Sequence, residues 1–127
     1  MGNGTNIGRV RALGSAHSGS HHWLMQRYTA IGNLLLGLFL LLSLAGLGDY
    51  SFASVHKWAA APLPATALGL FAISTFWHAR LGLQVLVEDY VHEHANKFAV
   101  MALLNLSAFA GGAFALLCVV RLALGAR

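Results

Sequence analysis

The sequence has few charged residues and a single cysteine. Only 4 acidic residues accompany 8 lysines and arginines, so charged residues make up 9% of the 127-residue chain. A soluble domain of this size needs more charge on its surface, so an ordinary water-soluble fold is excluded. Cys118, the one cysteine, cannot form an internal disulfide, and we expect it to serve packing.

The chain is instead rich in apolar residues, which make up 57% of it. Three apolar stretches each approach the roughly 20 residues that a helix needs to cross a bilayer. They run from about Met25 to Gly48, from Pro64 to Asp89, and from Lys97 to Leu122. The sequence therefore predicts an all-α membrane protein with three transmembrane helices, forming a single membrane-anchor domain over residues 1–127.

The segments between the spans are predicted to be short. Residues before Met25 are expected to form a short N-terminal cytoplasmic arm, with His21, His22 and Trp23 at the membrane interface. The segment looks too short and too weakly amphipathic for a cleaved transit peptide. A short loop bracketed by Tyr50 and Trp58 follows the first span, and the polar residues 92–97 are expected to turn the chain into the third.

The basic residues predict the orientation. Two groups flank opposite ends of the spans: Arg9, Arg11, Arg27 and Lys97 on one side, and Lys57, Arg121 and Arg127 on the other. The first group is the larger, which favours an N-terminus and a second loop in the cytoplasm, or in the matrix if the protein is mitochondrial. The expected location is a bacterial inner membrane, with the mitochondrial inner membrane as the weaker alternative. Most of the basic residues behind the net charge of +4 flank apolar spans, where orientation in the membrane and contact with lipid head groups explain them. No nucleic-acid partner is therefore expected.

One histidine lies inside an apolar span, and a polar pair follows it. His78 precedes Asp89 and Tyr90 by eleven and twelve residues. Eleven residues are about three helical turns, so His78 and Asp89 are expected on one face, roughly 16 Å apart. This spacing places the histidine near mid-membrane and the pair near a water boundary.

An imidazole at that depth needs a partner. One interpretation is a hydrogen bond between helices, worth about 1 kcal/mol, and the other is a metal ligand. Ser74 and Gly82 lie one turn before and after His78, and a face with such small residues favours a flat macrocycle such as haem. A b-type haem commonly takes two axial ligands, so the second would come from another chain. The other histidines are expected in solvated loops or the arm: His17, His21, His22, His56, His92 and His94.

The residues from His78 to Val91 carry a family resemblance. Their spacing of a histidine, ten residues and Asp-Tyr resembles the second transmembrane helix of the hydrophobic membrane anchor of succinate dehydrogenase, respiratory complex II. The stretches Arg11 to Gly14 and Trp23 to Ala30 resemble the arm and the start of the first helix in that family. The resemblance covers nearly the whole chain, although only the second-helix motif is specific.

The resemblance implies a succinate:ubiquinone oxidoreductase with four subunits. The partners would be a flavoprotein subunit, an iron–sulfur subunit and a second, cytochrome b556-type membrane anchor. His78 would supply one axial ligand to a haem b shared with that companion anchor. Tyr90 would donate a hydrogen bond to ubiquinone, Asp89 would orient the site and assist proton supply, and Arg27 would shape the pocket or pair with a haem propionate. This chain has no catalytic residue for succinate oxidation, so enzyme activity belongs to the complex.

Three alternatives stay open on the sequence. A structural anchor without haem would keep only the quinone pocket, and a fumarate reductase anchor would run the same chemistry in reverse. A small transporter subunit would use His78 and Asp89 as a proton relay, although the chain lacks paired intramembrane carboxylates and an inverted repeat. Arg80 lies off the face of His78, and its expected partner is a propionate, another subunit or the lipid head groups.

Overall fold

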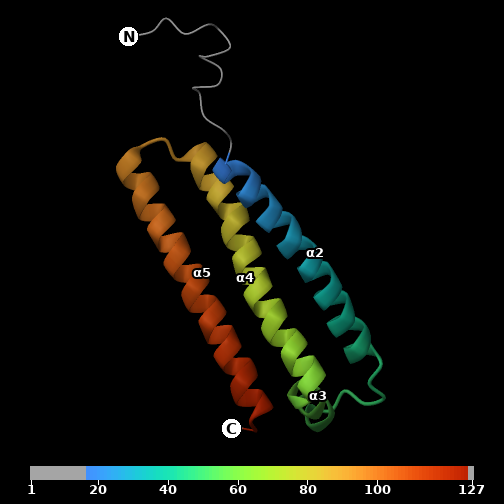
Figure 1. Ribbon diagram of the computed structural model, residues 1–127. Coiled ribbons are helices and arrows are strands. Elements are labelled where there is room, and N and C mark those ends of the chain that lie inside the picture. Colours follow the sequence, from blue (N-terminus) through green and yellow to red (C-terminus); the bar gives the residue numbers. More distant parts are fainter. Residues whose placement is uncertain (1–16, 126–127) are drawn as a thin grey trace, which may run out of the picture.

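The computed structural model describes residues 17–125, and its regular structure is helical throughout this range. Three helices are long and apolar enough to cross a membrane (Figure 1). This confirms the prediction of an all-α membrane protein with three transmembrane helices. The elements are α2 (His17–Ala45), α3 (Phe52–Ala60), α4 (Pro62–Tyr90) and α5 (His94–Ala123).

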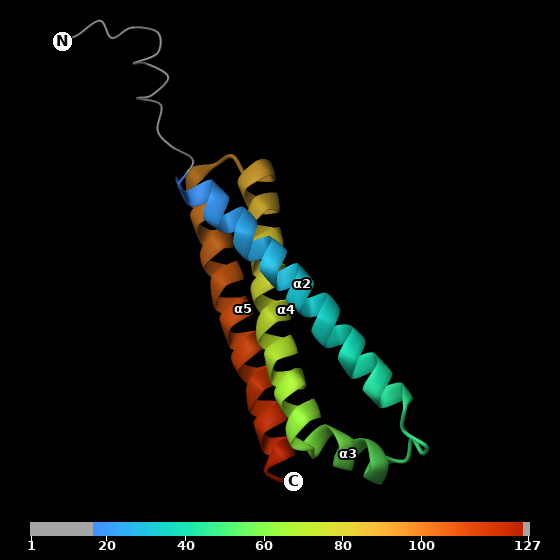
Figure 2. The same cartoon turned by 45° about the vertical axis from the view of Figure 1, so that its right-hand side comes forward.

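The helix α4 is central to the fold. It packs against α2 and against α5, and α3 lies below it at the end where α4 begins (Figures 1 and 2). Few side chains are enclosed by this arrangement, and no residue of α5 is buried. The extensive apolar surface therefore faces the membrane or another subunit, as expected where lipid replaces water around a helix. The buried apolar residues are Leu40, Ala59, Ala65, Ala67 and Leu81.

The helix α2 begins earlier than its apolar composition indicates. It starts at His17 instead of about Met25, and it ends at Ala45, just before Gly46. The prediction that His21, His22 and Trp23 belong to an arm is wrong, because these residues continue the helix. A helix that emerges from lipid can extend through polar residues, since its hydrogen bonds are internal. Arg9, Arg11, the stretch 11–14 and Arg127 lie outside the described residues.

The connection between the first two spans contains the short helix α3, which the sequence interpretation missed. Ser51 caps this helix by accepting a hydrogen bond from the backbone N–H of Ser54 at 3.4 Å. Hydrogen bonds from the hydroxyls of Ser51 and then Ser54 hold the pKa of the exposed Asp49 carboxyl below its ordinary value. His56 and Trp58, expected in a loop, therefore lie on a capped helix.

The connection between α4 and α5 is tighter than expected. Only residues 91–93 separate the two helices, so His94 and Lys97 belong to the first turn of α5 and not to a loop. The Lys97 ammonium donates a hydrogen bond to the backbone carbonyl of Glu88 at 3.1 Å. This contact satisfies one of the free carbonyls near the end of α4 and fixes the two helices as antiparallel neighbours.

Candidate functional site

His78 contacts α2 through a threonine. Its Nδ1 lies 3.0 Å from Oγ1 of Thr29, and the imidazole is half-buried. The threonine oxygen also lies 2.9 Å from the backbone carbonyl of Met25 and 3.1 Å from that of Gln26. The mid-helix histidine thus forms the interhelical hydrogen bond that was one of its two expected uses.

The small residues beside His78 are part of the same helix contact. The Ser74 hydroxyl donates to the backbone carbonyl of Thr29 at 3.3 Å. A Cβ atom added to Gly82 would lie 3.7 Å from Nε2 of Gln26. Ser74 thus joins α4 to α2 by a hydrogen bond, and Gly82 faces Gln26 of α2 with ordinary room for a methyl group.

The second ring nitrogen of His78 faces away from Thr29. In imidazole, Nδ1 and Nε2 point in nearly opposite directions, so a bond at Nδ1 turns Nε2 away from α2. Within residues 17–125, Nε2 has no hydrogen-bond partner and is not among the fully buried nitrogens. An imidazole with one nitrogen anchored and the other without a partner has the donor chemistry that a haem iron ligand would need. The residues present thus fit one ligand of such a group.

Asp89 and Tyr90 end α4, and both are exposed; Tyr90 retains 77% of its accessible surface. Arg27 is exposed on α2, with its guanidinium 5.3 Å from the centre of the Trp23 ring. The start of α2 and the end of α4 lie at the same end of the molecule (Figure 2). Within the described chain, however, no hydrogen bond or salt bridge joins Arg27 to Asp89 or Tyr90. The structure therefore brings the three residues to the same end of the molecule without joining them in one site.

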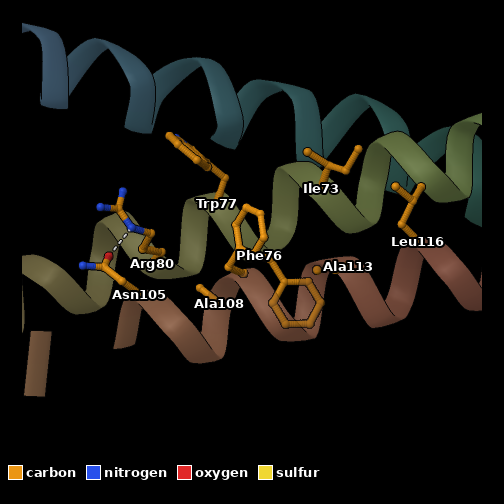
Figure 3. Close-up of a pocket in the computed structure, with 10 residues that line it drawn as sticks. Ile73, Phe76, Trp77, Arg80, Asn105, Ala108, Ala113 and Leu116 are labelled. Carbon is orange, nitrogen blue, oxygen red and sulfur yellow. Dashed lines mark hydrogen bonds between the residues drawn. The ribbon is translucent and has the colours of Figure 1, made fainter. Parts of the chain in front are cut away.

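Arg80 lies at a pocket between α4 and α5 (Figure 3). The pocket has a volume of about 520 Å³ and is apolar except for Arg80 and Asn105. The Nε of Arg80 donates to Oδ1 of Asn105 at 2.5 Å, and its guanidinium lies 5.2 Å from the centre of the Trp77 ring. Arg80 is thus held by a neutral amide and an aromatic face, with no carboxylate in contact among residues 17–125.

A second pocket, of about 440 Å³, lies between α2 and α4 and is more polar. His22 lines it and is half-buried, and its Nε2 is fully buried without a hydrogen-bond partner in the described chain. The expectation of a solvated imidazole at position 22 is therefore wrong. The polar side chains gathered around this pocket are His21, His22, Arg80, Gln84 and Glu88.

Sequence reasoning missed Thr29 and Asn105 as partners of the two polar residues on α4. Thr29 lies within a stretch that carries the family resemblance, but nothing in its local sequence pairs it with His78, 49 residues away. Asn105 is a polar residue inside an apolar span, and that alone could have marked it as an intramembrane hydrogen-bonding group.

The three apolar helices, with a histidine on the central one and a polar pair at its end, define a multi-pass membrane protein. The particular family follows from comparison with known proteins. Residues 1–114 match the model of the succinate dehydrogenase/fumarate reductase transmembrane subunit, and the chain belongs to this family.

Individual relatives agree with this assignment. The chain is 41% identical over 87 residues to a succinate dehydrogenase hydrophobic membrane anchor subunit of Rickettsia bellii, covering 67% of this chain and 68% of the relative. It is 32% identical over 94 residues to the succinate dehydrogenase membrane anchor subunit of Reclinomonas americana, covering 72% and 78%. No solved structure matches the chain significantly. The resemblance read from residues 78–91 is thereby confirmed at the level of the family.

Proposed function

We propose that this chain anchors a succinate:ubiquinone oxidoreductase in a bacterial inner membrane, with its N-terminus in the cytoplasm. In this function it holds a haem b jointly with a companion anchor and forms part of the site where ubiquinone is reduced. The flavoprotein and iron–sulfur subunits oxidise succinate and deliver the electrons. The observation that carries the proposal is the His78 imidazole, anchored at Nδ1 and free at Nε2, in a chain of this family.

His78 is the proposed axial ligand of this chain. Its anchored ring is held in a fixed orientation, which a ligand needs if the iron is to keep a constant geometry. When bound, haem supplies one-electron transfer at mid-membrane depth. The second ligand would come from the companion anchor, as the family resemblance implies, and His78 is the one histidine of α4.

The exposed end of α4 is the proposed quinone site. Reduction places negative charge on the quinone carbonyl oxygens, and the Tyr90 hydroxyl can donate a hydrogen bond to one of them where water is scarce. Asp89 is exposed beside it and can pass protons between the aqueous side and the site. Arg27, exposed on α2 at the same end, contributes a fixed positive charge.

The alternatives differ in what they require. A fumarate reductase anchor would use the same residues, and the family name includes both enzymes. A haem-less anchor would leave Nε2 of His78 facing lipid or another subunit without a ligand role. A proton-relay transporter would need His78 and Asp89 linked by a polar path, yet His78 bonds to Thr29 and Asp89 lies exposed about three turns away.

The test uses the complex purified through a tag on this chain. Reduced-minus-oxidised spectra are recorded for wild type, His78→Ala and His56→Ala, where His56 lies on α3 at the opposite end of α4. The proposal expects a b-type band in wild type and His56→Ala that is lost or shifted in His78→Ala, together with co-purified dehydrogenase subunits. A b-type band unchanged in His78→Ala would remove the ligand assignment. A homo-oligomer without any band would overturn the whole proposal.

A further inference from the structure

We infer that Thr29 is a positioning residue for His78, which selects the tautomer that leaves Nε2 free to bind metal. This inference rests on the proposed function. It is carried by the hydrogen bonds that converge on one threonine at the α2–α4 contact. Thr29 lies on α2, outside the motif of residues 78–91, which lies on α4 and the residue that follows it.

The Thr29 hydroxyl has a single proton to donate. Its oxygen lies 2.9 Å from the Met25 carbonyl and 3.1 Å from the Gln26 carbonyl, and a carbonyl can only accept. When the hydroxyl donates to either carbonyl, its lone pairs remain for a donor. The Nδ1 of His78 lies 3.0 Å away and can be that donor when it carries the ring proton.

His78 has two tautomers, with the ring proton on Nδ1 or on Nε2. With the proton on Nδ1, both the hydroxyl and the ring N–H are satisfied, and Nε2 carries a free lone pair. With the proton on Nε2, the ring would present an N–H group that has no partner within residues 17–125. An unsatisfied N–H at membrane depth is costly, so the contact favours the tautomer that can bind metal.

The side chain of Thr29 is itself held rigidly. Its β-branched side chain is restricted in rotation, and its hydroxyl is bonded back to the preceding helical turn. Its own backbone carbonyl accepts the hydroxyl of Ser74 at 3.3 Å, which fixes α2 against α4 one turn away from His78. The hydrogen-bond acceptor offered to Nδ1 is thus held from two sides.

This geometry has a measurable electronic consequence. An imidazole that donates its Nδ1–H to an acceptor becomes a stronger electron donor at Nε2. A stronger donor stabilises the oxidised iron more than the reduced iron, and so lowers the reduction potential. Loss of the Thr29 hydroxyl is therefore expected to raise the haem potential and to weaken haem retention by about tenfold.

The experiment compares Thr29→Val, Thr29→Ser and Thr75→Val in the purified complex. Thr75 donates to Oδ1 of Asn33 at 3.4 Å, so Thr75→Val also deletes a hydroxyl bond between α4 and α2 without touching His78. Haem content per complex, the haem midpoint potential and the electron paramagnetic resonance spectrum of the oxidised haem are measured. We expect a more positive potential and an altered spectrum in Thr29→Val, whereas Thr29→Ser and Thr75→Val resemble wild type.

Failure of the Thr29 role and failure of the proposed function would give different results. A potential and spectrum in Thr29→Val equal to wild type would overturn the role of Thr29, while a haem band lost in His78→Ala would leave the proposed function intact. A shift of equal size in Thr75→Val would also overturn it, because the effect would then come from helix packing. If Thr29→Val does not assemble, Thr29→Ala removes the same hydroxyl with a smaller side chain, and the same comparison decides.

Discussion

Arg80 on α4 and Asn105 on α5 form the shortest polar link described between those two helices, with Nε of the arginine 2.5 Å from Oδ1 of the asparagine. The rest of the pocket around them is apolar. A hydrogen bond to a charged group is stronger than one between neutral groups, and lipid cannot replace it. This pair is therefore a specific stabilising contact within an otherwise apolar interface.

Removal of the Asn105 side chain tests that role. In Asn105→Ala, Arg80 loses its amide partner, and we expect the complex to lose about 1 kcal/mol of stability. The matched control is Asn33→Ala, because Asn33 accepts only a longer, neutral hydrogen bond from Thr75, at 3.4 Å. Thermal unfolding of the two purified variants should show the larger loss in Asn105→Ala. Equal losses would mean that the charge on Arg80 adds nothing to the contact.

Tyr90→Phe tests the proposed quinone site. The substitution keeps the ring but removes the hydroxyl donor, so succinate:quinone reductase activity should fall by about 10²-fold. The haem band and the reduction of an artificial dye by the dehydrogenase subunits should stay unchanged. Tyr50→Phe is the control, because the Tyr50 hydroxyl donates to the Ala45 carbonyl at the other membrane boundary. Full quinone reductase activity in Tyr90→Phe would exclude the donor role.

Two adjacent glycines of α5 differ in how closely they approach Phe76 of α4. A Cβ added to Gly111 would lie 2.9 Å from the Phe76 Cζ, whereas one added to Gly112 would lie 3.5 Å from the Phe76 Cβ, an ordinary contact distance. Gly111→Ala must displace the ring and should cost about 1–3 kcal/mol, while Gly112→Ala should be nearly neutral.

The Gly111 prediction is checked by thermal unfolding of the complex. The double variant Gly111→Ala with Phe76→Leu should recover part of the loss, because the smaller side chain leaves room for the new methyl group. The opposite ranking of the two glycine variants would show that α4 and α5 pack differently from this arrangement.

The sequence was sufficient to predict the three spanning helices, because their apolar length depends on the bilayer and not on neighbours. It also placed His78, Asp89 and Tyr90 on one helix. The start of α2 and the presence of α3 were missed, because hydropathy marks only the apolar part of a helix and gives no signal for polar residues that extend or cap it.

The partners of the polar residues could not be predicted for a different reason. The contact between His78 and Thr29 depends on how α2 and α4 are rotated against each other, and helices that are apolar on all sides carry little periodic signal of that rotation. Arg80 illustrates the same point. Its direction away from His78 follows from helical spacing, but its choice of Asn105 follows only from the packing of α5.

The small number of buried side chains affects how long this chain survives before assembly. A row of helices with only five buried apolar side chains among the described residues has almost no interior of its own. In the proposed complex, a copy synthesised ahead of its companion anchor can cover its exposed faces only with lipid, and such unassembled protein is open to degradation. We therefore expect the supply of the companion anchor, more than the rate of its own synthesis, to set how long each new copy survives.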